Sequence, residues 1–348
     1  MCRLVDHNNS KNKNKIILEK VLVTGASGFI AIHCINELIK AGYLVKGSLR
    51  NMKREDEVRK SLEKDSENHK LEFCKLDLLD DEGWDEAAFD CDYLLHVASP
   101  FTIEEPKKES ILINPAVEGT LRALNASKNS SKVKKVVLTS SMAAIAYGHN
   151  KQLCSPEDWT DTTKNVGAYV KSKTIAEKAA WDFIHNDNEH SFSMTTIHPG
   201  MVFGPLLSDD VDGASAELLS KMINGKIPAL PDAYFTVVDV RDVAKLHVES
   251  LRKNQSDNKR IIVTSPQGIN IMEISNILRK NGYKKVPQNF IPTKMINSLA
   301  PFNKEMKSMA AMVNRGSYCA DITETISIFN WEPISLEKTL IDMGNSLK

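Results

Sequence analysis

Tyr169 and Lys173 lie four positions apart in the segment GAYVKSKTIAEKAAW, residues 167–181, whose pattern predicts a helix. Side chains at this spacing share one helix face, so the lysine ammonium can act on the phenol. We expect this charge to lower the pKa of Tyr169 from about 10 toward neutral pH, which would make the tyrosine a usable general acid. Two ordinary residues on an amphipathic surface are the alternative interpretation.

Two serines, Ser140 and Ser141, occur in VVLTSSMAAI at the end of another predicted strand. Ligands of parallel sheets bind at the carboxyl ends of the strands. A serine hydroxyl in that place could donate a second hydrogen bond to a carbonyl oxygen that becomes negative during reduction.

A glycine-rich turn follows the first predicted strand, in VLVTGASGFIAIHCINELI, and opens a predicted helix. Gly25 would turn the chain sharply, Gly28 would let the backbone approach a pyrophosphate, and Ala31 would allow close helix packing. A tight turn without a ligand is the alternative. The combination in chain order of this turn, the serine pair and the Tyr–Lys pair favours a dinucleotide-dependent catalyst.

The end of the second predicted strand reads KGSLRNMKR, where a carboxylate would select NAD and a cation would select NADP. Arg50 stands at the specifying position, and no acidic residue occurs before Glu55. We therefore predict NADP(H), since a 2'-phosphate needs cations. Contact with cofactor and simple solvent exposure remain open for Lys53 and Arg54.

Two further strand ends carry candidate cofactor contacts. Asp77 could accept a hydrogen bond from the adenine amino group, or it could cap a helix. The segment HVASP, residues 96–100, is small enough to leave room for a cofactor. His96 is expected to be a packed or backbone-bonded histidine.

The surrounding elements predict an α/β fold with a doubly wound parallel sheet, of the Rossmann type, and a smaller, discontinuous C-terminal substrate lobe. Short apolar runs begin near residues 20, 43, 71, 92, 134, 192 and 260, and most are separated by helical patterns. Asn270 and Ser335 are candidate N-caps of helices in the lobe. The expected division is a flexible tail at 1–15, an NADP-binding domain at 16–203 and 234–265, and a substrate lobe at 204–233 and 266–348.

Composition narrows the class of partner. The 348 residues contain 45 basic and 45 acidic side chains, so no net charge favours nucleic acid or an anionic membrane. The six cysteines form no C-x-x-C pair and the histidines show no metal-ligand spacing, so we expect no metal. A cytoplasmic protein with a small-molecule partner is predicted, since no apolar run reaches the length of a membrane span.

These motifs together resemble the extended short-chain dehydrogenase/reductases, and within them the dihydroflavonol-reductase-like group of carbonyl reductases. The matching segments run in the order of the family from about residue 20 to 250: VTGASGFIA, GSLRN, DLLDDEGWDEA, HVASPF, NPAVEGT, VVLTSSMAAI, YVKSKTIAEKAAW and HPGMVFGP. The resemblance implies Ser141 as the catalytic serine, Tyr169 as the proton donor and Lys173 as the residue that binds the nicotinamide ribose. It also implies a monomer or a homodimer.

The expected cofactor site joins the residues derived above with those that the resemblance implies. It comprises Gly25, Ser27, Gly28, Phe29, Ile30, Arg50, Asp77, Leu78, Val97, Ala98, Ser99, Lys173, Pro199 and Val202. The resemblance assigns Arg50 to the 2'-phosphate and residues 199–202 to the nicotinamide carboxamide. Asn114 stands where many relatives carry lysine.

Departures from the family limit the substrate. NVGAY lacks the aromatic and cysteine residues that precede the tyrosine of cinnamoyl-CoA reductases, and Ala146 replaces a polar reader of flavonoid rings. A small or apolar aldehyde or ketone is therefore predicted. Phe203, Leu206 and Leu207 could line its site or pack in the core.

The leading hypothesis is an NADPH-dependent reductase that converts this carbonyl to an alcohol. A nucleotide-sugar epimerase or dehydratase of the same fold is one alternative, although Arg50 argues against NAD. A non-catalytic NADP-sensing regulator is another, although it would not need Ser141, Tyr169 and Lys173 together.

Overall fold

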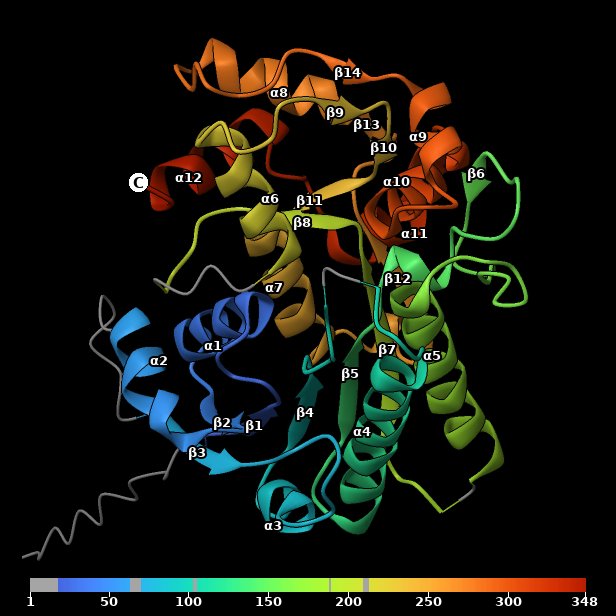
Figure 1. The fold of residues 1–348 in the computed structure, drawn as a ribbon. Helices are drawn as coiled ribbons and strands as arrows, with labels where there is room; N and C mark the ends of the chain where they lie inside the picture. The colour runs from blue at the N-terminus through green and yellow to red at the C-terminus, as the bar shows by residue number, and fades with distance from the viewer. Residues whose placement is uncertain (1–17, 63–69, 103–104, 188, 209–212) are drawn as a thin grey trace, which may run out of the picture.

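A seven-stranded parallel sheet forms the centre of the molecule in the computed structural model, which describes residues 18–62, 70–102, 105–187, 189–208 and 213–348 (Figure 1). The strand order is β12-β7-β5-β4-β1-β2-β3. The strands are β1 (Lys20–Val23), β2 (Leu44–Leu49), β3 (Leu71–Lys75), β4 (Tyr93–His96), β5 (Lys135–Thr139), β7 (Ser193–Pro199) and β12 (Lys259–Val263). All seven coincide with segments predicted as strands, although β12 begins one residue before its predicted start at 260, and the predicted Rossmann class is confirmed. The tail at 1–15 lies outside the described residues.

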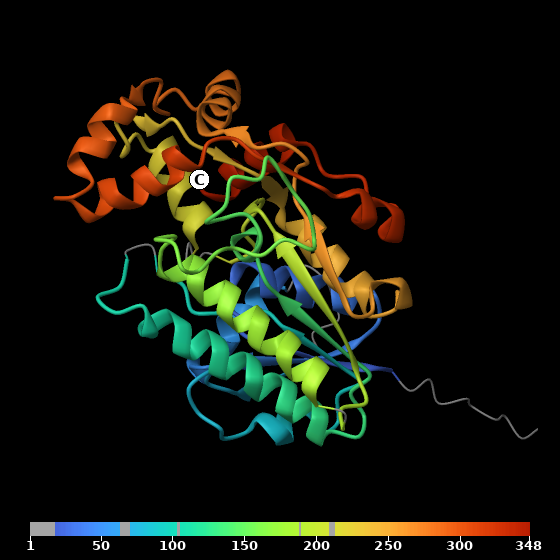
Figure 2. The same ribbon diagram turned by 90° about the vertical axis from the view of Figure 1, so that its right-hand side faces the viewer.

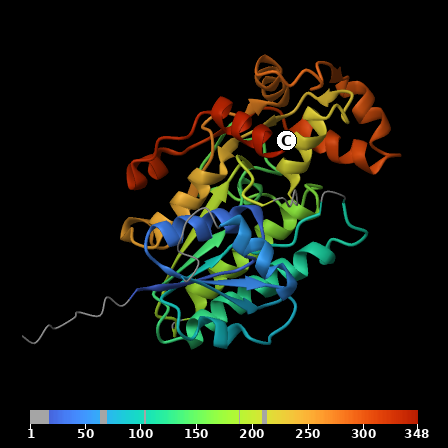
Figure 3. The same cartoon turned by 90° about the vertical axis from the view of Figure 1, so that its left-hand side faces the viewer.

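Helices cover both faces of this sheet, as the alternation of strands and helices predicts. Figures 2 and 3 view the molecule from opposite sides. The green helices α4 and α5 lie in front in Figure 2, and the blue helix α1 lies in front in Figure 3. The helices are α1 (Phe29–Lys40), α2 (Glu55–Ser61), α3 (Trp84–Ala88), α4 (Ser110–Asn129), α5 (Ala168–Asn186) and α7 (Val240–Ser250).

The first strand, β1, shows why the strand sequences are apolar at every position instead of alternating between apolar and polar residues. Val21 and Val23 pack in one hydrophobic cluster with α1 and α7, while Leu22 packs in a second cluster with α4 and α5. Successive side chains of a strand point to opposite faces, so a sheet covered on both sides needs apolar residues at every position.

The remaining elements form a lobe beyond the carboxyl ends of the strands (Figures 1 and 2). Its helices are α6 (Ala214–Ile223), α8 (Ile271–Lys280), α9 (Thr293–Leu299), α10 (Lys304–Arg315) and α12 (Leu336–Ser346). Helix α11 (Thr323–Phe329) instead packs against the edge strand β12, where Thr325 Oγ1 donates to the Ile262 carbonyl at 2.7 Å. Short strands pair within and beside it: β6 (Leu153–Cys154), β8 (Met201–Phe203), β9 (Leu230–Pro231), β10 (Tyr234–Phe235), β11 (Val237–Asp239), β13 (Ile269–Asn270), β14 (Phe290–Ile291) and β15 (Cys319–Ala320).

Both predicted caps in the lobe are confirmed. Asn270 accepts a hydrogen bond from the Met272 N–H at 2.8 Å, and Ser335 accepts one from Lys338. A third apolar cluster joins α6, α8 and α12. The exact division into a nucleotide-binding domain and a substrate lobe stays a prediction. None of the helices in the described ranges is long and apolar enough to cross a membrane.

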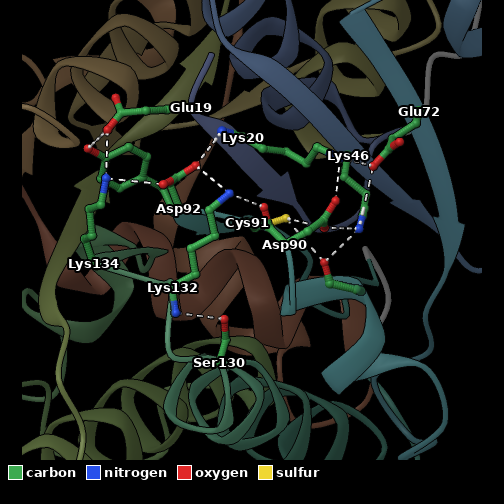
Figure 4. A network of polar contacts seen from close by, with 12 residues as sticks. Glu19, Lys20, Lys46, Glu72, Asp90, Cys91, Asp92, Ser130, Lys132 and Lys134 are labelled. Carbon is green, nitrogen blue, oxygen red and sulfur yellow. Dashed lines mark hydrogen bonds and ion pairs between the residues drawn. The ribbon is translucent and has the colours of Figure 1, made fainter. Parts of the chain in front are cut away.

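The amino ends of the strands carry a network of charged side chains at the edge of the sheet away from the lobe (Figure 4). Lys20 on β1 and Lys46 on β2 both contact the Asp90 carboxylate at 2.5 Å. Asp92 accepts a hydrogen bond from the Lys20 N–H and pairs with Lys132 and Lys134. Burial opposes the charge of Asp90, but the bonds from the two lysines dominate and lower its pKa to about 2.

Replacing Asp90 with asparagine is expected to lower the melting temperature at neutral pH by about 2 °C or more, because Lys20 and Lys46 lose a shared carboxylate. The folded-state pKa of Asp90 lies below its ordinary value of 3.8. Its contribution is therefore present above about pH 4 and is lost as the pH falls toward about 2. Thermal melts followed by circular dichroism over this range measure the effect.

Asp81→Asn is the matched control, since Asp81 pairs with Arg122 at 2.5 Å but its side chain is 89% exposed. We expect a smaller loss, because solvent screens an exposed pair. A deficit of Asp90→Asn that persists unchanged at about pH 2.5, or an equal deficit in the control, would contradict this prediction.

Candidate active site

A threonine hydroxyl joins the carboxyl ends of β1 and β4. Thr24 Oγ1 accepts hydrogen bonds from the Val97 and Ala98 N–H groups, both at 3.0 Å, and lies 3.0 Å from His96 Nδ1. The hydroxyl has one proton, which it donates to Nδ1, so the His96 ring carries its own proton on Nε2. Burial lowers the pKa of His96 to about 3. His96 is the packed histidine that the sequence predicts, and its partner is a side chain.

The glycine-rich turn lies directly against this junction. Gly25 has a φ of +70°, and a Cβ at this position would lie 3.0 Å from the Ala98 Cβ. The Gly25 N–H donates to Ser48 Oγ at 3.1 Å, which ties the turn to β2. The turn of residues 25–28, called the glycine cradle below, therefore packs so closely against Ala98 that an added Cβ at Gly25 would force one of them to shift.

The cradle ends at the first turn of α1. Gly28 is the N-cap of this helix and supplies no capping side chain, so the first N–H groups of α1 are available to an anion such as a phosphate. Ala31 is buried, as close packing of the helix requires. Ser27, Phe29 and Ile30 belong to the same turn and helix start. These residues fit a dinucleotide pyrophosphate.

Three cations follow β2, and they differ in their surroundings. Arg50 is exposed directly after the strand, and Lys53 is exposed in the next turn. Arg54 instead donates to both carboxylate oxygens of Glu57, at 2.9 and 2.8 Å. Arg50 is therefore better placed than Arg54 to meet a 2'-phosphate.

Asp77 does not cap a helix, so that alternative is wrong. Its Oδ1 accepts a hydrogen bond from the Leu79 N–H at 3.0 Å, which closes a turn, while α3 begins later with Gly83 as its N-cap. The turn that Asp77 forms leaves Leu78 partly buried against the core beside α4. Local turn formation competed successfully with capping.

Ser141, Tyr169 and Lys173 come together at the carboxyl end of β5. Ser141 Oγ accepts from the Ala143 N–H at 3.1 Å, and the serine side chain also hydrogen-bonds the Tyr169 phenol. Lys173 is buried, and its Nζ donates to the Thr139 carbonyl at 3.0 Å. The structure thus brings the three predicted catalytic side chains into one cluster.

The expected effect of Lys173 on Tyr169 is wrong for this arrangement. Burial raises the pKa of the Tyr169 phenol above its ordinary value, the Ser141 hydrogen bond opposes this rise, and Lys173 is not among the causes. The pKa of Lys173 is itself lowered to about 8, because burial outweighs the opposing charge of Glu177. Sequence spacing predicts proximity, but it does not contain the cost of desolvation.

Two residues of the connection after β4 contribute to this cluster and were not assigned from the sequence. The Phe101 ring meets Tyr169 edge to face, with centroids 5.2 Å apart, and is 43% exposed. Glu105 Oε1 accepts a hydrogen bond from the Ala168 N–H at 2.8 Å, and so caps α5 from a distant segment. The position of Phe101, directly after the small residues of HVASP, was the only signal available.

The segment 199–202 crosses from β7 into the lobe. Gly200 is required there, because a Cβ would collide with the Thr264 side chain and the Thr236 carbonyl. The Met201 N–H donates to the Thr236 carbonyl at 2.7 Å. This bond fixes the 199–202 segment, which includes Val202, against the strand that follows Thr236.

The candidate lining residues after this segment are mostly packed. Phe203 is fully buried in the core of the lobe, so it does not line a site. Leu206 and Leu207 are partly buried against apolar clusters. Ala146 is buried and its carbonyl accepts from Arg315 Nε at 2.8 Å, while Asn114 is exposed on α4.

Gly25→Ala is expected to weaken NADPH binding by about tenfold or more, because the new methyl would push the Gly25 turn and Ala98 apart and so displace the backbone of the proposed pyrophosphate site. Gly42→Ala is the control, since Gly42 has a φ of +90° and nothing within 4 Å of its added Cβ. Both changes strain the backbone by about 1 kcal/mol, but only the first alters the cradle. Fluorescence titration with NADPH compares them, and equal dissociation constants would count against the cradle.

The chain is similar to known proteins over most of its length. The model of the family described as "NAD dependent epimerase/dehydratase family" matches residues 21–264. The chain is 36% identical over 267 residues to "Cinnamoyl-CoA reductase CAD2" of Medicago truncatula, which covers 75% of this chain and 80% of that protein. It is 33% identical over 288 residues to "NADPH-dependent methylglyoxal reductase GRE2" of Saccharomyces cerevisiae, covering 75% and 82%.

A solved structure extends the match over nearly the whole fold. The crystal structure of yeast methylglyoxal/isovaleraldehyde reductase Gre2 complexed with NADPH superposes with a TM-score of 0.79 at 26% identity, covering 94% of this chain and 98% of that one. The resemblance predicted from the motifs is confirmed. The chain belongs to the NAD dependent epimerase/dehydratase family of extended short-chain dehydrogenase/reductases.

Proposed function

We propose that this protein is an NADPH-dependent oxidoreductase that reduces an aldehyde or ketone to an alcohol, with Tyr169 as the proton donor. The observation that carries the proposal is the cluster of Ser141, Tyr169 and Lys173 at the sheet edge that also holds the Gly25 cradle. Relatives named as NADPH-dependent reductases support the same class of reaction.

Each member of the cluster has a distinct task in this proposal. Tyr169 is protonated at neutral pH because its pKa is raised, so its hydroxyl can give a proton to the carbonyl oxygen. Ser141 donates a hydrogen bond to the same oxygen as negative charge develops. The Lys173 ammonium stays beside them through its bond to the Thr139 carbonyl. NADPH, when bound, supplies the hydride that reaches the carbonyl carbon.

The proposed cofactor contacts follow the elements around the cradle. The pyrophosphate would lie on residues 25–30, the 2'-phosphate on Arg50, and the adenine near Asp77 and Leu78. Val97, Ala98 and Ser99 would border the nucleotide, Lys173 would meet the nicotinamide ribose, and Pro199 and Val202 would hold the nicotinamide.

The proposed substrate is a small or apolar carbonyl compound. Phe101 presents an apolar ring beside Tyr169, and no polar reader stands at the buried Ala146. NVGAY argues against cinnamoyl-CoA despite the cinnamoyl-CoA reductase among the relatives. The epimerase alternative shares the family, and purified protein that retains NAD through turnover would favour it.

Wild-type protein is expected to oxidise NADPH with at least one member of a panel of small aldehydes, α-dicarbonyls, aryl ketones and β-keto esters. Tyr169→Phe should lower kcat by about 100-fold or more, because the proton donor is lost while the ring remains. The dissociation constant for NADPH should stay within about twofold. Absorbance at the NADPH band and fluorescence titration measure the two quantities.

Tyr283→Phe is the control for this prediction, since the Tyr283 hydroxyl bonds Asn345 on the lobe surface. It should leave kcat unchanged. Normal turnover in Tyr169→Phe would exclude the proposed proton donor, and tight NADPH binding with no turnover on any carbonyl would favour a sensor.

Arg50→Gln is expected to weaken NADPH binding by about tenfold or more while NADH binding changes little, because only the 2'-phosphate needs the guanidinium. Arg54→Gln is the matched control, since Glu57 already engages that guanidinium. Titrations of both variants with both cofactors give the preference. Parallel losses for NADPH and NADH in Arg50→Gln would argue against its role as the specifier.

A further inference from the structure

A buried carboxylate lies behind the catalytic cluster. Glu177 on α5 follows Lys173 by one helical turn, and its side chain is 1% exposed. Glu177 Oε2 accepts a hydrogen bond from Ser140 Oγ at 2.6 Å, and Oε1 accepts one from Arg260 Nε at 2.7 Å. Both oxygens of this carboxylate are therefore committed to partners from other elements.

His198 on β7 completes the surroundings of this carboxylate. Its Nε2 lies 2.8 Å from each Glu177 oxygen. A carboxylate can only accept, so His198 carries a proton on Nε2. Burial lowers the pKa of His198, and His198 and Arg260 hold the pKa of Glu177 well below its ordinary range against its own burial. Glu177 is the anion of the group and Arg260 its main cation.

Arg260 connects the carboxylate to a third segment. Its guanidinium stacks 3.8 Å above the centroid of the Trp159 ring. Its Nη1 donates to the carbonyl of Asp158 at 2.7 Å and also to that of Pro156. The ion pair thus joins α5, β12 and the loop that leads into α5. Loss of either partner would leave an uncompensated buried charge.

The hydrogen bond from Ser140 connects the Glu177 carboxylate to the segment that carries the catalytic groups. Ser140 lies between Thr139, whose carbonyl accepts from Lys173 Nζ, and Ser141, whose hydroxyl meets Tyr169. The Ser140 N–H also donates to the Ile197 carbonyl at 2.8 Å. Holding the Ser140 side chain therefore restrains the two neighbouring groups on which the proposed chemistry depends.

We propose that Glu177 is a positioning residue for the reduction: through Ser140 it sets the Thr139–Ser141 segment, and its negative charge keeps Lys173 an ammonium. This inference rests on the proposed function for its kinetic readouts. The role is distinct from catalysis, because Glu177 lies behind the segment and contacts none of the proposed reacting groups.

The charges that face Lys173 determine the expected pH dependence. Glu177 on α5 favours the ammonium, while Arg260 on β12 is cationic, and His198 on β7 and His96 on β4 are neutral because burial lowers their pKa values. The pKa of Lys173 is lowered to about 8 in the presence of Glu177. Removing the carboxylate charge lowers it further, so activity that needs the ammonium is lost at a lower pH.

Glu177→Gln tests the charge, Ser140→Ala tests the hydrogen bond, and Trp181→Phe is the matched control. Trp181 Nε1 donates to Glu177 Oε1 at 3.2 Å, whereas Ser140 binds Oε2, so this change leaves the bond to the serine in place. For each variant we would measure kcat and KM with NADPH and an aldehyde across pH, the NADPH dissociation constant, and the melting temperature.

Glu177→Gln should lower kcat by about tenfold or more at neutral pH, and shift the alkaline limb of its pH profile to lower pH by about half a unit or more. Ser140→Ala should lower kcat about fivefold or more with an unshifted limb. Trp181→Phe should keep kcat within about twofold and the limb unshifted. NADPH binding should be similar in all three.

Two results would overturn the proposal. One is a Glu177→Gln variant that loses melting temperature but keeps the wild-type kcat and alkaline limb, as a purely structural role requires. The other is a wild-type kcat in Ser140→Ala, which remains decisive even if Glu177→Gln fails to fold.

A readout independent of turnover separates this inference from the proposed function. The rate at which acetic anhydride labels Lys173, followed by mass spectrometry across pH, reports the pKa of the amine. Glu177→Gln should move that titration to lower pH even if no carbonyl is reduced. An unmoved titration would contradict the proposal, whereas an inactive wild type with a moved titration would contradict only the proposed function.

Discussion

The parallel pairing of β1 with β4 is the constraint on which the candidate site depends. Val23 lies opposite Leu95, so the next residues of both strands emerge together at the same edge of the sheet. Thr24 can therefore bind the backbone of the 96–98 segment, and the Gly25 turn can press against Ala98. In this sheet β1 has β2 on one side and β4 on the other, so the chain order reverses there and opens the crevice where such folds bind ligands.

Charged groups serve different purposes in two parts of the molecule. At the amino ends of the strands, Lys20, Lys46 and Asp90 form pairs that water partly screens, and these pairs join β1 and β2 to the segment before β4. Behind the catalytic cluster, by contrast, Glu177 and Arg260 are almost fully enclosed. An enclosed ion pair contributes little net stability, since desolvation offsets its attraction, and its value lies in the geometry that it imposes on its neighbours.

The relatives share a fold with this chain, but they are named for different substrates. The parallel sheet and the helices that cover it belong to the fold that this chain shares with Gre2. Under the proposed function, the substrate would be selected by side chains beside Tyr169 such as Phe101, while the buried Ala146 offers no polar group. Function in such folds resides in the site rather than in the architecture, so relatives named for different carbonyl compounds are expected at about one third identity.

The sequence by itself predicted the strands, the sharp turn at Gly25 and the caps at Asn270 and Ser335, and with the family resemblance it predicted that Ser141, Tyr169 and Lys173 share one site. These predictions depend on the pattern of apolar residues, on the conformational range of single residues and on the order of the motifs along the chain. All three can be read from the sequence without knowing the fold. Only the tertiary structure decided that Phe101 meets Tyr169, that Glu105 caps α5, and that Phe203 belongs to the core. It also decided the protonation behaviour of the site. Glu177 and Arg260 are 83 residues apart in the chain, and the pKa of Tyr169 depends on its burial. Desolvation and long-range pairing arise only when distant segments exclude water together, so a spacing of four residues could predict a contact but not its energy.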